Sequence, residues 1–392
     1  MTDIGILKQR AIQAVDARRD ELIRISTTIH ANPEVAFQEF QAAALLCDAL
    51  QAGGFQVARG IAGLDTAFRA ERRGSGDGPT IAFLAEYDAL PELGHACGHN
   101  IMGTAAVGAA LALAAVLDQL PGRVVVIGTP AEEGGGGKVL LVERGVFADV
   151  DAAMIVHPSA RTMVARGSLA SMRLVFEFTG KASHAAAAPE EGINALEAVI
   201  LTFNNVNALR LHLKPDARVH GIITHGGSAA NIIPEYAAAQ FSVRAAKQMY
   251  ARHVLERVTQ CAEAGATATG ATLKTTLKMG YAEMIPNLTL AHAFAANWEM
   301  LGILVNEPRW GEPMGSTDMG NVSHAVPAIH PYIYIGDFAG HTPEFRDAAI
   351  APAAHAGLLQ AAKGMAMTAV DLLSDPDLMA RVQREFADTV RA

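Results

Sequence analysis

Side chains that bind metal ions gather in residues 95–99, which have the sequence His-Ala-Cys-Gly-His. Cys97 and His99 place a thiol and an imidazole two residues apart, and the carboxylates Glu86 and Asp88 precede them at the end of an apolar run. Thiolates and imidazoles are preferred ligands of zinc, whereas carboxylates also accept manganese. Active sites of open α/β sheets lie at the carboxyl ends of the strands. We therefore expect these donors at that edge of a sheet.

Further donors follow other apolar or Pro-marked segments. Glu132 and Glu133 come after the apolar run 123–129 and precede four glycines, His157 precedes a proline, and His341 lies near the end of the chain. Adjacent glutamates are usually a solvated surface, but their position after a buried strand and before glycines favours a site. The candidate ligands are more numerous than one ion requires. If one glutamate of the pair binds metal, its neighbour remains available for acid–base chemistry.

Composition narrows the class of protein. The chain has 392 residues, 51% of them apolar, and a net charge of −9. This length favours two domains, and the absence of a basic stripe argues against binding of nucleic acid. The three cysteines, at positions 47, 97 and 261, show no disulfide framework. Together with an N-terminus that lacks a signal-peptide pattern, they favour a cytoplasmic protein.

One segment, 104–120, is rich in Ala and Leu and is about as long as a membrane span. It contains Gly and ends before Pro121-Gly122. Because alanine contributes little to membrane insertion, we expect a helix buried against a sheet and no membrane association.

The elements that must position these residues alternate between helices and strands. Helical periodicity over 7–26 and 37–52, strands near 66–70 and 81–85, the Ala-rich helix and a strand at 123–129 predict an α/β fold with a mostly parallel sheet. The pattern changes between residues 170 and 286, where two helices and four half-exposed strands predict an inserted α+β domain with an antiparallel sheet. The catalytic domain would then be discontinuous, comprising 1–169 and 287–392. His341 reaches the other donors only if the C-terminal part completes the same sheet.

Several separate segments resemble the M20 metallopeptidases. They are 84–91 (Leu-Ala-Glu-Tyr-Asp-Ala-Leu-Pro), 95–100, 132–134, 180–184 (Gly-Lys-Ala-Ser-His) and 231–234 (Asn-Ile-Ile-Pro). Within that family the chain is similar to the M20D amidohydrolases, a group with aminoacylases, auxin-conjugate hydrolases, p-aminobenzoyl-glutamate hydrolase and dipeptidases. The resemblance covers nearly the whole chain, from residue 29 onward.

The resemblance implies a dinuclear metallohydrolase with a defined ligand set. Two divalent ions, Zn or Mn, would be held by five side chains, namely Cys97, His99, Glu133, His157 and His341. Glu132 would be the general base that takes a proton from the attacking water and delivers it to the leaving amine. Asp88 would orient a ligand from outside the coordination sphere.

The inserted domain would act as a lid and dimerisation domain. The resemblance implies that His184 reaches the active site of a partner subunit in a homodimer and stabilises the oxyanion, and that Asn231 and Arg244 hold the substrate's carbonyl and carboxylate. From the residues alone, His184 could equally be a structural loop histidine, Asn231 a turn residue and Arg244 a partner of a surface acid.

The resemblance implies hydrolysis of an amide in an N-acyl amino acid, a dipeptide or a p-aminobenzoyl-glutamate-like small molecule. The same centre could instead act on an ester, a carbamate or an aromatic amine. A binding protein with relic motifs is disfavoured because Glu132 and every ligand position are retained. Asn100 stands where many aminoacylase-like members have Asp, and the loss of a charge beside two ligands is expected to weaken or reposition the metals.

Overall fold

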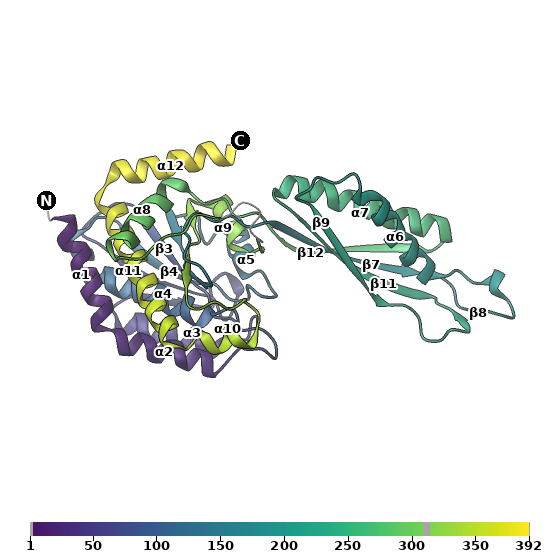
Figure 1. Ribbon diagram of the computed structural model, residues 1–392, viewed down its shortest axis with the longest axis horizontal. Coiled ribbons are helices and arrows are strands. Elements are labelled where there is room, and N and C mark those ends of the chain that lie inside the picture. Colours follow the sequence, from purple (N-terminus) through teal and green to yellow (C-terminus); the bar gives the residue numbers. More distant parts are fainter. Residues whose placement is uncertain (1–2, 309–313, 392) are drawn as a thin grey trace. The chain divides into compact units, whose positions relative to one another are not determined.

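The computed structural model describes residues 3–308 and 314–391. It divides into two compact units. The first comprises residues 1–167, 284–313 and 318–392, and the second comprises 168–283 and 314–317. The first unit contains the α/β sheet, and the second is built on an antiparallel sheet (Figure 1). This arrangement confirms the fold class predicted from the sequence.

The first unit is organised around a six-stranded sheet whose central and C-terminal strands are parallel. In spatial order its strands are β1 (Gln56–Arg59), β2 (Phe68–Arg73), β4 (Arg123–Gly128), β3 (Thr80–Ala85), β5 (Ala152–Met154) and β13 (Ala328–Ile329). β1 and β2 form an antiparallel edge, which the sequence had not indicated. A separate parallel pair, β6 (His157–Ser159) and β14 (Tyr332–Tyr334), extends beyond β5.

Helices cover both faces of this sheet. Alternate residues of β3 point to opposite sides, so Phe83 packs in one hydrophobic cluster and Leu84 in another. The cluster of Phe83 includes residues of α1 (Ile4–Ala17), α2 (Arg19–Ala31), α3 (Phe40–Ala52), α4 (His99–Ala114), α8 (Leu288–Met300) and α11 (Pro352–Ser374). The cluster of Leu84 includes residues of α5 (Gly137–Glu143) and α9 (Met319–Ala325). The short helix α10 (Pro343–Ala348) follows His341, and α12 (Pro376–Arg391) packs on α8 and α11.

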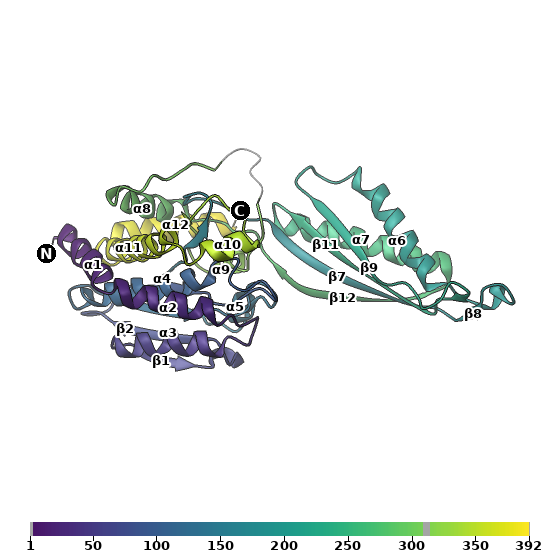
Figure 2. The same cartoon turned by 60° about the horizontal axis from the view of Figure 1, so that its bottom comes forward.

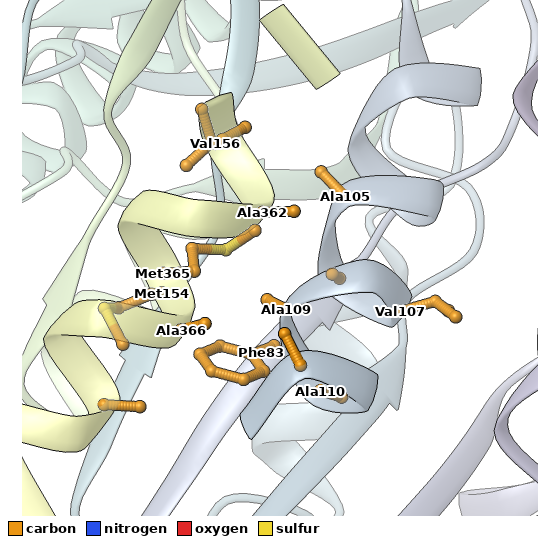
Figure 3. Close-up of a cluster of buried hydrophobic side chains, with 14 of the residues drawn as sticks. Phe83, Ala105, Val107, Ala109, Ala110, Met154, Val156, Ala362, Met365 and Ala366 are labelled. Atoms are coloured by element: carbon orange, nitrogen blue, oxygen red, sulfur yellow. The ribbon is translucent and has the colours of Figure 1, made fainter. Parts of the chain in front are cut away.

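Helix α4 is the Ala-rich segment, and every residue in it is buried. Its small side chains allow close approach to α11: a Cβ at Gly108 would lie 3.2 Å from Cβ of Ala362. Figure 3 shows the ring of Phe83 lying beside Ala109 of α4 and Ala366 of α11. The helix begins at His99, earlier than expected, which places a candidate ligand in its first turn. Among the described residues, no helix is long and apolar enough to cross a membrane.

Two predicted helices are each divided in the structure. The periodicity over 7–26 spans α1 and α2, which break at Arg18. The long helix that the sequence also predicts from residue 351 onward ends at Ser374, before α12 begins. At Arg18 the backbone φ of −102° and ψ of 8° lie outside the helical region, although the apolar spacing continues across the break. The apolar periodicity over 7–26 therefore predicted which helix face is buried, but it did not predict the break at Arg18.

The second unit packs two helices on a four-stranded antiparallel sheet. Its strands, in spatial order, are β12 (Thr272–Tyr281), β7 (Ala170–Thr179), β11 (Tyr236–Ala245) and β9 (Arg218–His225), and its helices are α6 (Ala195–Arg210) and α7 (Gln248–Thr269). Phe176, Phe178 and Phe241 lie on the face that packs with these helices. A small antiparallel pair, β8 (Ser183–His184) and β10 (Ile232–Ile233), lies beyond the end of β7 and β11 (Figures 1 and 2).

Candidate metal centre and active site

Cys97 and His157 meet beside the carboxyl ends of the parallel strands. Nε2 of His157 lies 3.3 Å from Sγ of Cys97, and Nδ1 lies 2.6 Å from the carbonyl oxygen of Pro158. That carbonyl can accept a hydrogen bond only from a protonated Nδ1, which leaves the lone pair of Nε2 directed at the thiol. Burial lowers the pKa of His157 to about 4, so the imidazole is neutral at physiological pH. Gly98 permits this approach, since a Cβ there would lie 2.4 Å from Cγ of Pro158.

His99 is oriented by Asp88. Its Nδ1 lies 2.8 Å from the carbonyl oxygen and 3.0 Å from Oδ1 of Asp88, so this nitrogen also carries the proton. Oδ2 of Asp88 accepts a hydrogen bond of 2.9 Å from the backbone amide of Glu133. One carboxylate therefore fixes two candidate ligands. Nε2 of His99 faces Oε1 of Glu86 at 2.8 Å.

Glu133 and His341 bring the two ends of the first unit together. Nε2 of His341 lies 3.2 Å from Oε1 of Glu133, and the backbone amide of His341 donates to the carbonyl oxygen of Ala96 at 2.9 Å. The contact with Glu133 raises the pKa of His341. Burial raises the pKa of Glu133, but the contacts with His341 and His99 outweigh burial and lower it. The C-terminal part thus supplies a donor to a site that the N-terminal part begins.

The donor atoms form two groups that share Cys97. Within each group, every donor atom lies within 4.8 Å of the others. The groups are Cys97, His99 and His157, and Cys97, Glu133 and His341. These groups contain the five ligand positions expected from the sequence, and Cys97 belongs to both.

The chemistry of these donors fits divalent cations. Nε2 of His99 and Oε1 of Glu133 are buried and, within the part of the chain that the structure describes, make no aligned hydrogen bond. Buried polar atoms normally make well-aligned hydrogen bonds, so two ligand atoms that contact only other members of the cluster fit a shared cation. Burial also raises the pKa of the Cys97 thiol. A divalent cation would satisfy both atoms and convert the thiol to a thiolate.

Glu132 is half-buried between the donors and further carboxylates. Its pKa is raised well above the usual value, first by burial and then by the charges of Glu86 and Asp318. Glu86, His99 and Glu132 form a third group of donors within 4.8 Å. A carboxyl group with a raised pKa beside a cluster of ligands is suited to accept and return a proton.

Glu86, Lys138 and Asp318 form a buried charged network that the sequence reasoning missed. Nζ of Lys138 lies 2.8 Å from Oδ1 of Asp318 and also contacts Oε2 of Glu86. The Lys138 side chain has 0% exposure. Burial lowers the pKa of a lysine, but the two carboxylates outweigh burial and keep Lys138 a cation. A signal was present, because Lys138 is a lone charge between four glycines and the apolar run 139–142.

The side chain of Asn100 has a structural role in α4, and its expected effect on the metals stays a prediction. The Asn100 side chain is fully buried and donates to Oγ of Ser26 at 2.9 Å and to the carbonyl oxygen of Ala349 at 3.2 Å. It ties α4 to α2 and to the segment after α10. The residue follows His99 in sequence, but the helix turns its side chain to another face.

The second unit brings His184 and Asn231 together and keeps Arg244 apart from them. His184 pairs with Ile232 between β8 and β10, and the amide of Ala185 donates to the carbonyl oxygen of Asn231 at 3.0 Å. Both His184 and Asn231 are exposed. Tyr236 begins β11 at the end nearer to His184 and Asn231, and Arg244 lies near the other end of the strand. At about 3.3 Å per residue, Tyr236 and Arg244 are roughly 25 Å apart. Nε of Arg244 is buried and, among the described residues, has no hydrogen-bond partner.

Comparison with known sequences gives a consistent result. Residues 82–360 match the family described as peptidase family M20/M25/M40. The chain is 41% identical to an Xaa-Arg dipeptidase from Mus musculus, with 98% of this chain and 93% of the relative covered. It is 32% identical to one of the subunits of p-aminobenzoyl-glutamate hydrolase from Escherichia coli strain K12, with 95% and 93% covered.

Solved structures share the fold. A dinuclear metal-binding peptidase of the M20 family from Bacillus subtilis superposes with a TM-score of 0.71 at 23% identity, covering 92% of this chain and 99% of that one. An aminobenzoyl-glutamate utilization protein from Klebsiella pneumoniae gives a TM-score of 0.71 at 21% identity, covering 92% and 97%. At these identities the similarity establishes a common architecture.

Proposed function

Because this chain belongs to peptidase family M20/M25/M40, we propose that it is a metal-dependent amide hydrolase in which Glu132 is the general base. The observation that carries the proposal is the pair of donor groups that share Cys97 beside Glu132. The resemblance noted in the sequence to the M20 family is confirmed, as is the prediction of an enzyme.

Two divalent ions, Zn or Mn, would be held by Cys97, His99, Glu133, His157 and His341. When bound, such ions supply Lewis acidity, which polarises the substrate's carbonyl group and lowers the pKa of water. The residues of the chain prepare this centre. Contacts on Nδ1 of His99 and His157 leave Nε2 of each free to bind an ion. Asp88 holds the imidazole of His99 and the backbone of Glu133 in one arrangement.

Glu132 would move the proton. Its carboxylate accepts a proton from the attacking water as the water oxygen bonds to the carbonyl carbon, and it then delivers that proton to the amide nitrogen as the C–N bond breaks. Amine leaving groups are poor unless protonated, so both transfers are needed. Burial and the charges of Glu86 and Asp318, which raise the pKa of Glu132, favour the protonated form that the second transfer requires.

The relatives indicate the first substrates to assay. One is named for Xaa-Arg dipeptides and another for p-aminobenzoyl-glutamate. Both are amides whose amine product is an amino acid with a free carboxylate. Arg244 would bind that carboxylate, since its buried Nε lacks a hydrogen-bond partner among the described residues.

We further propose a homodimer in which the second unit serves as a lid and dimerisation domain. A dipeptide is about 10 Å long, whereas Arg244 lies roughly 25 Å along β11 from Tyr236, and His184 lies on the β8–β10 pair beyond that end of the strand (Figure 1). One dipeptide would therefore not contact both Arg244 and His184. If both residues serve hydrolysis, they serve two different active sites, so His184 and Asn231 would act in a partner subunit. The edge strand β9 exposes Ile222 (62%) and Ile223 (45%), which supports pairing with a second copy.

The test combines substrate turnover with metal content for the wild type and Glu132→Gln. Release of free amine would be followed for Xaa-Arg dipeptides, N-acyl amino acids and p-aminobenzoyl-glutamate, and bound metal would be counted by mass spectrometry. The proposal expects about two ions in both proteins and a loss of kcat of at least about 100-fold in the variant. Full activity of Glu132→Gln would refute the general base. Bound metal without cleavage of any amide would refute the reaction class and direct the assay to esters, carbamates and aryl amines.

A further inference from the structure

Two residues with left-handed backbone conformations share one hydrogen-bond acceptor. Phe37 has φ of 60° and Ala131 has φ of 61°, and neither is glycine. Oε1 of Glu39 accepts a hydrogen bond of 2.9 Å from the backbone amide of each. A non-glycine residue with positive φ is strained and persists only where its surroundings hold it. The Glu39 carboxylate is therefore part of what keeps both segments in place.

The Glu39 carboxylate is itself fixed. Its side chain is fully buried immediately before α3. Oε2 accepts a hydrogen bond of 2.7 Å from Oγ1 of Thr66, whose carbonyl oxygen accepts one of 2.6 Å from the hydroxyl of Tyr87. Donors from three separate segments thus determine the direction of both carboxylate oxygens. A fully satisfied network of buried hydrogen bonds is rigid, so the amides of Phe37 and Ala131 that donate to Glu39 are restricted in their movement.

Ala131 directly precedes the glutamate pair. Its carbonyl oxygen accepts hydrogen bonds from the amides of Gly135 at 3.0 Å and Gly136 at 2.7 Å, so Glu39 fixes the N–H and the glycine turn fixes the C=O. A Cβ on Gly135 would lie 2.3 Å from the Phe37 ring, which shows how closely the two left-handed segments pack. The direction in which Glu132 leaves the backbone depends on this peptide.

We propose that Glu39 is a positioning residue that holds the Ala131 peptide and thereby aims Glu132 and Glu133 at the reacting centre. The inference rests on the proposed function in so far as those two residues are the general base and a ligand. Among the residues that the structure describes, Glu39 belongs to none of the groups of candidate ligand atoms. It acts through the backbone: it accepts the N–H of Ala131, whereas the glycine turn donates to the C=O of the same residue.

The experiment compares Glu39→Ala and Glu39→Gln with Glu34→Ala. Glu34 is a matched control, because its carboxylate also accepts two backbone amides, those of Gln41 and Ala42, but in the first turn of α3. We expect Glu39→Ala to lower kcat at least about tenfold with KM nearly unchanged, because ground-state binding does not use Glu132. Glu39→Gln keeps an oxygen for both amides and should recover most of that loss. Equal values of kcat for Glu39→Ala and Glu34→Ala would overturn the proposal.

Two substrate-independent measurements separate this inference from the proposed function. Hydrogen exchange of a peptide covering residues 130–138 should be at least about tenfold faster in Glu39→Ala, since the amide of Ala131 loses its acceptor. Affinity for Zn or Mn should fall because Glu133 is displaced. If the wild type cleaves no amide, the proposed function fails while these two results still decide the role of Glu39. Unchanged hydrogen exchange at residues 130–138 in Glu39→Ala would overturn the positioning role of Glu39.

Should Glu39→Ala fail to fold, Thr66→Val provides a milder perturbation. It removes the donor to Oε2 and leaves the carboxylate in place. We expect faster exchange at residues 130–138 and a kcat lowered about threefold. Wild-type exchange and kcat in Thr66→Val would overturn the proposed network.

Discussion

Lys138 and Asp318 form a buried ion pair across 180 residues of sequence, with 2.8 Å between Nζ and Oδ1. Asp318 also accepts the backbone amide of Lys138 at 2.9 Å. The pair joins the first turn of α5 to the start of α9, and Glu86 extends it to the end of β3. One buried cation thereby links three segments beside the candidate metal centre.

Lys138→Met is expected to destabilise the protein by about 3 to 5 kcal/mol, because it leaves two buried carboxylates without their cation. Urea unfolding measures the change. Lys363→Met is the matched control: Lys363 pairs with Asp16 at 2.6 Å, but the Asp16 side chain is 53% exposed. Removal of that pair should cost at most about 1 kcal/mol. Similar losses in the two variants would contradict a network specific to Lys138.

Replacement of single ligands should separate the two metal positions. Cys97 belongs to both donor groups, whereas His157 and His341 belong to one each. We expect Cys97→Ala to lose about two ions and His157→Ala and His341→Ala to lose about one each. Metal counting by mass spectrometry after dialysis measures this. Cys47→Ala, which removes a buried thiol in α3, should retain both ions. A full complement of metal in Cys97→Ala would exclude the shared ligand.

The stability of the protein should carry a pH dependence due to Glu39. Burial, with a smaller contribution from the charge of Asp88, raises the pKa of Glu39 from 4.5 to about 7. Between these values the folded protein holds a proton that the unfolded chain has lost, so the contribution of Glu39 to stability decreases as the pH rises from 4.5 to about 7. Relative to Glu39→Gln, the wild type should lose about 3 kcal/mol across this interval. The free energy of unfolding would be measured against pH for both proteins. Parallel curves would exclude the raised pKa of Glu39.

Mixing two inactive variants tests whether His184 acts in the partner subunit. In a heterodimer of Glu132→Gln and His184→Ala, one active site carries both defects and the other carries neither. If subunits exchange freely, half the dimers are mixed, and activity should recover to about a quarter of the wild type. If His184 acts within its own chain, every site keeps one defect and no activity returns. Light scattering checks the oligomeric state of each preparation.

The sequence by itself determined the fold class and the family. Apolar runs such as Ile81 to Ala85 predict buried strands because a covered parallel sheet needs apolar residues on both faces. The set of candidate ligands followed from the resemblance to the M20 family, because His157 and His341 stand alone in the sequence and only folding brings them to Cys97. The break at Arg18 was not predictable, since helical periodicity continues through it. The break after Ser374 has a sequence signal, because Asp375 and Pro376 are a typical cap and first residue of a new helix.

The tertiary structure alone decided how the donors are shared and supported. That Cys97 joins both groups, that Lys138 balances Glu86 and Asp318, and that Glu39 holds the Ala131 peptide are all contacts between distant segments. Residue type and local spacing determine which atoms are available as ligands or hydrogen-bond partners. Which of those atoms meet depends on how the chain packs, because buried donors and charges are stable only when folding brings their partners to them.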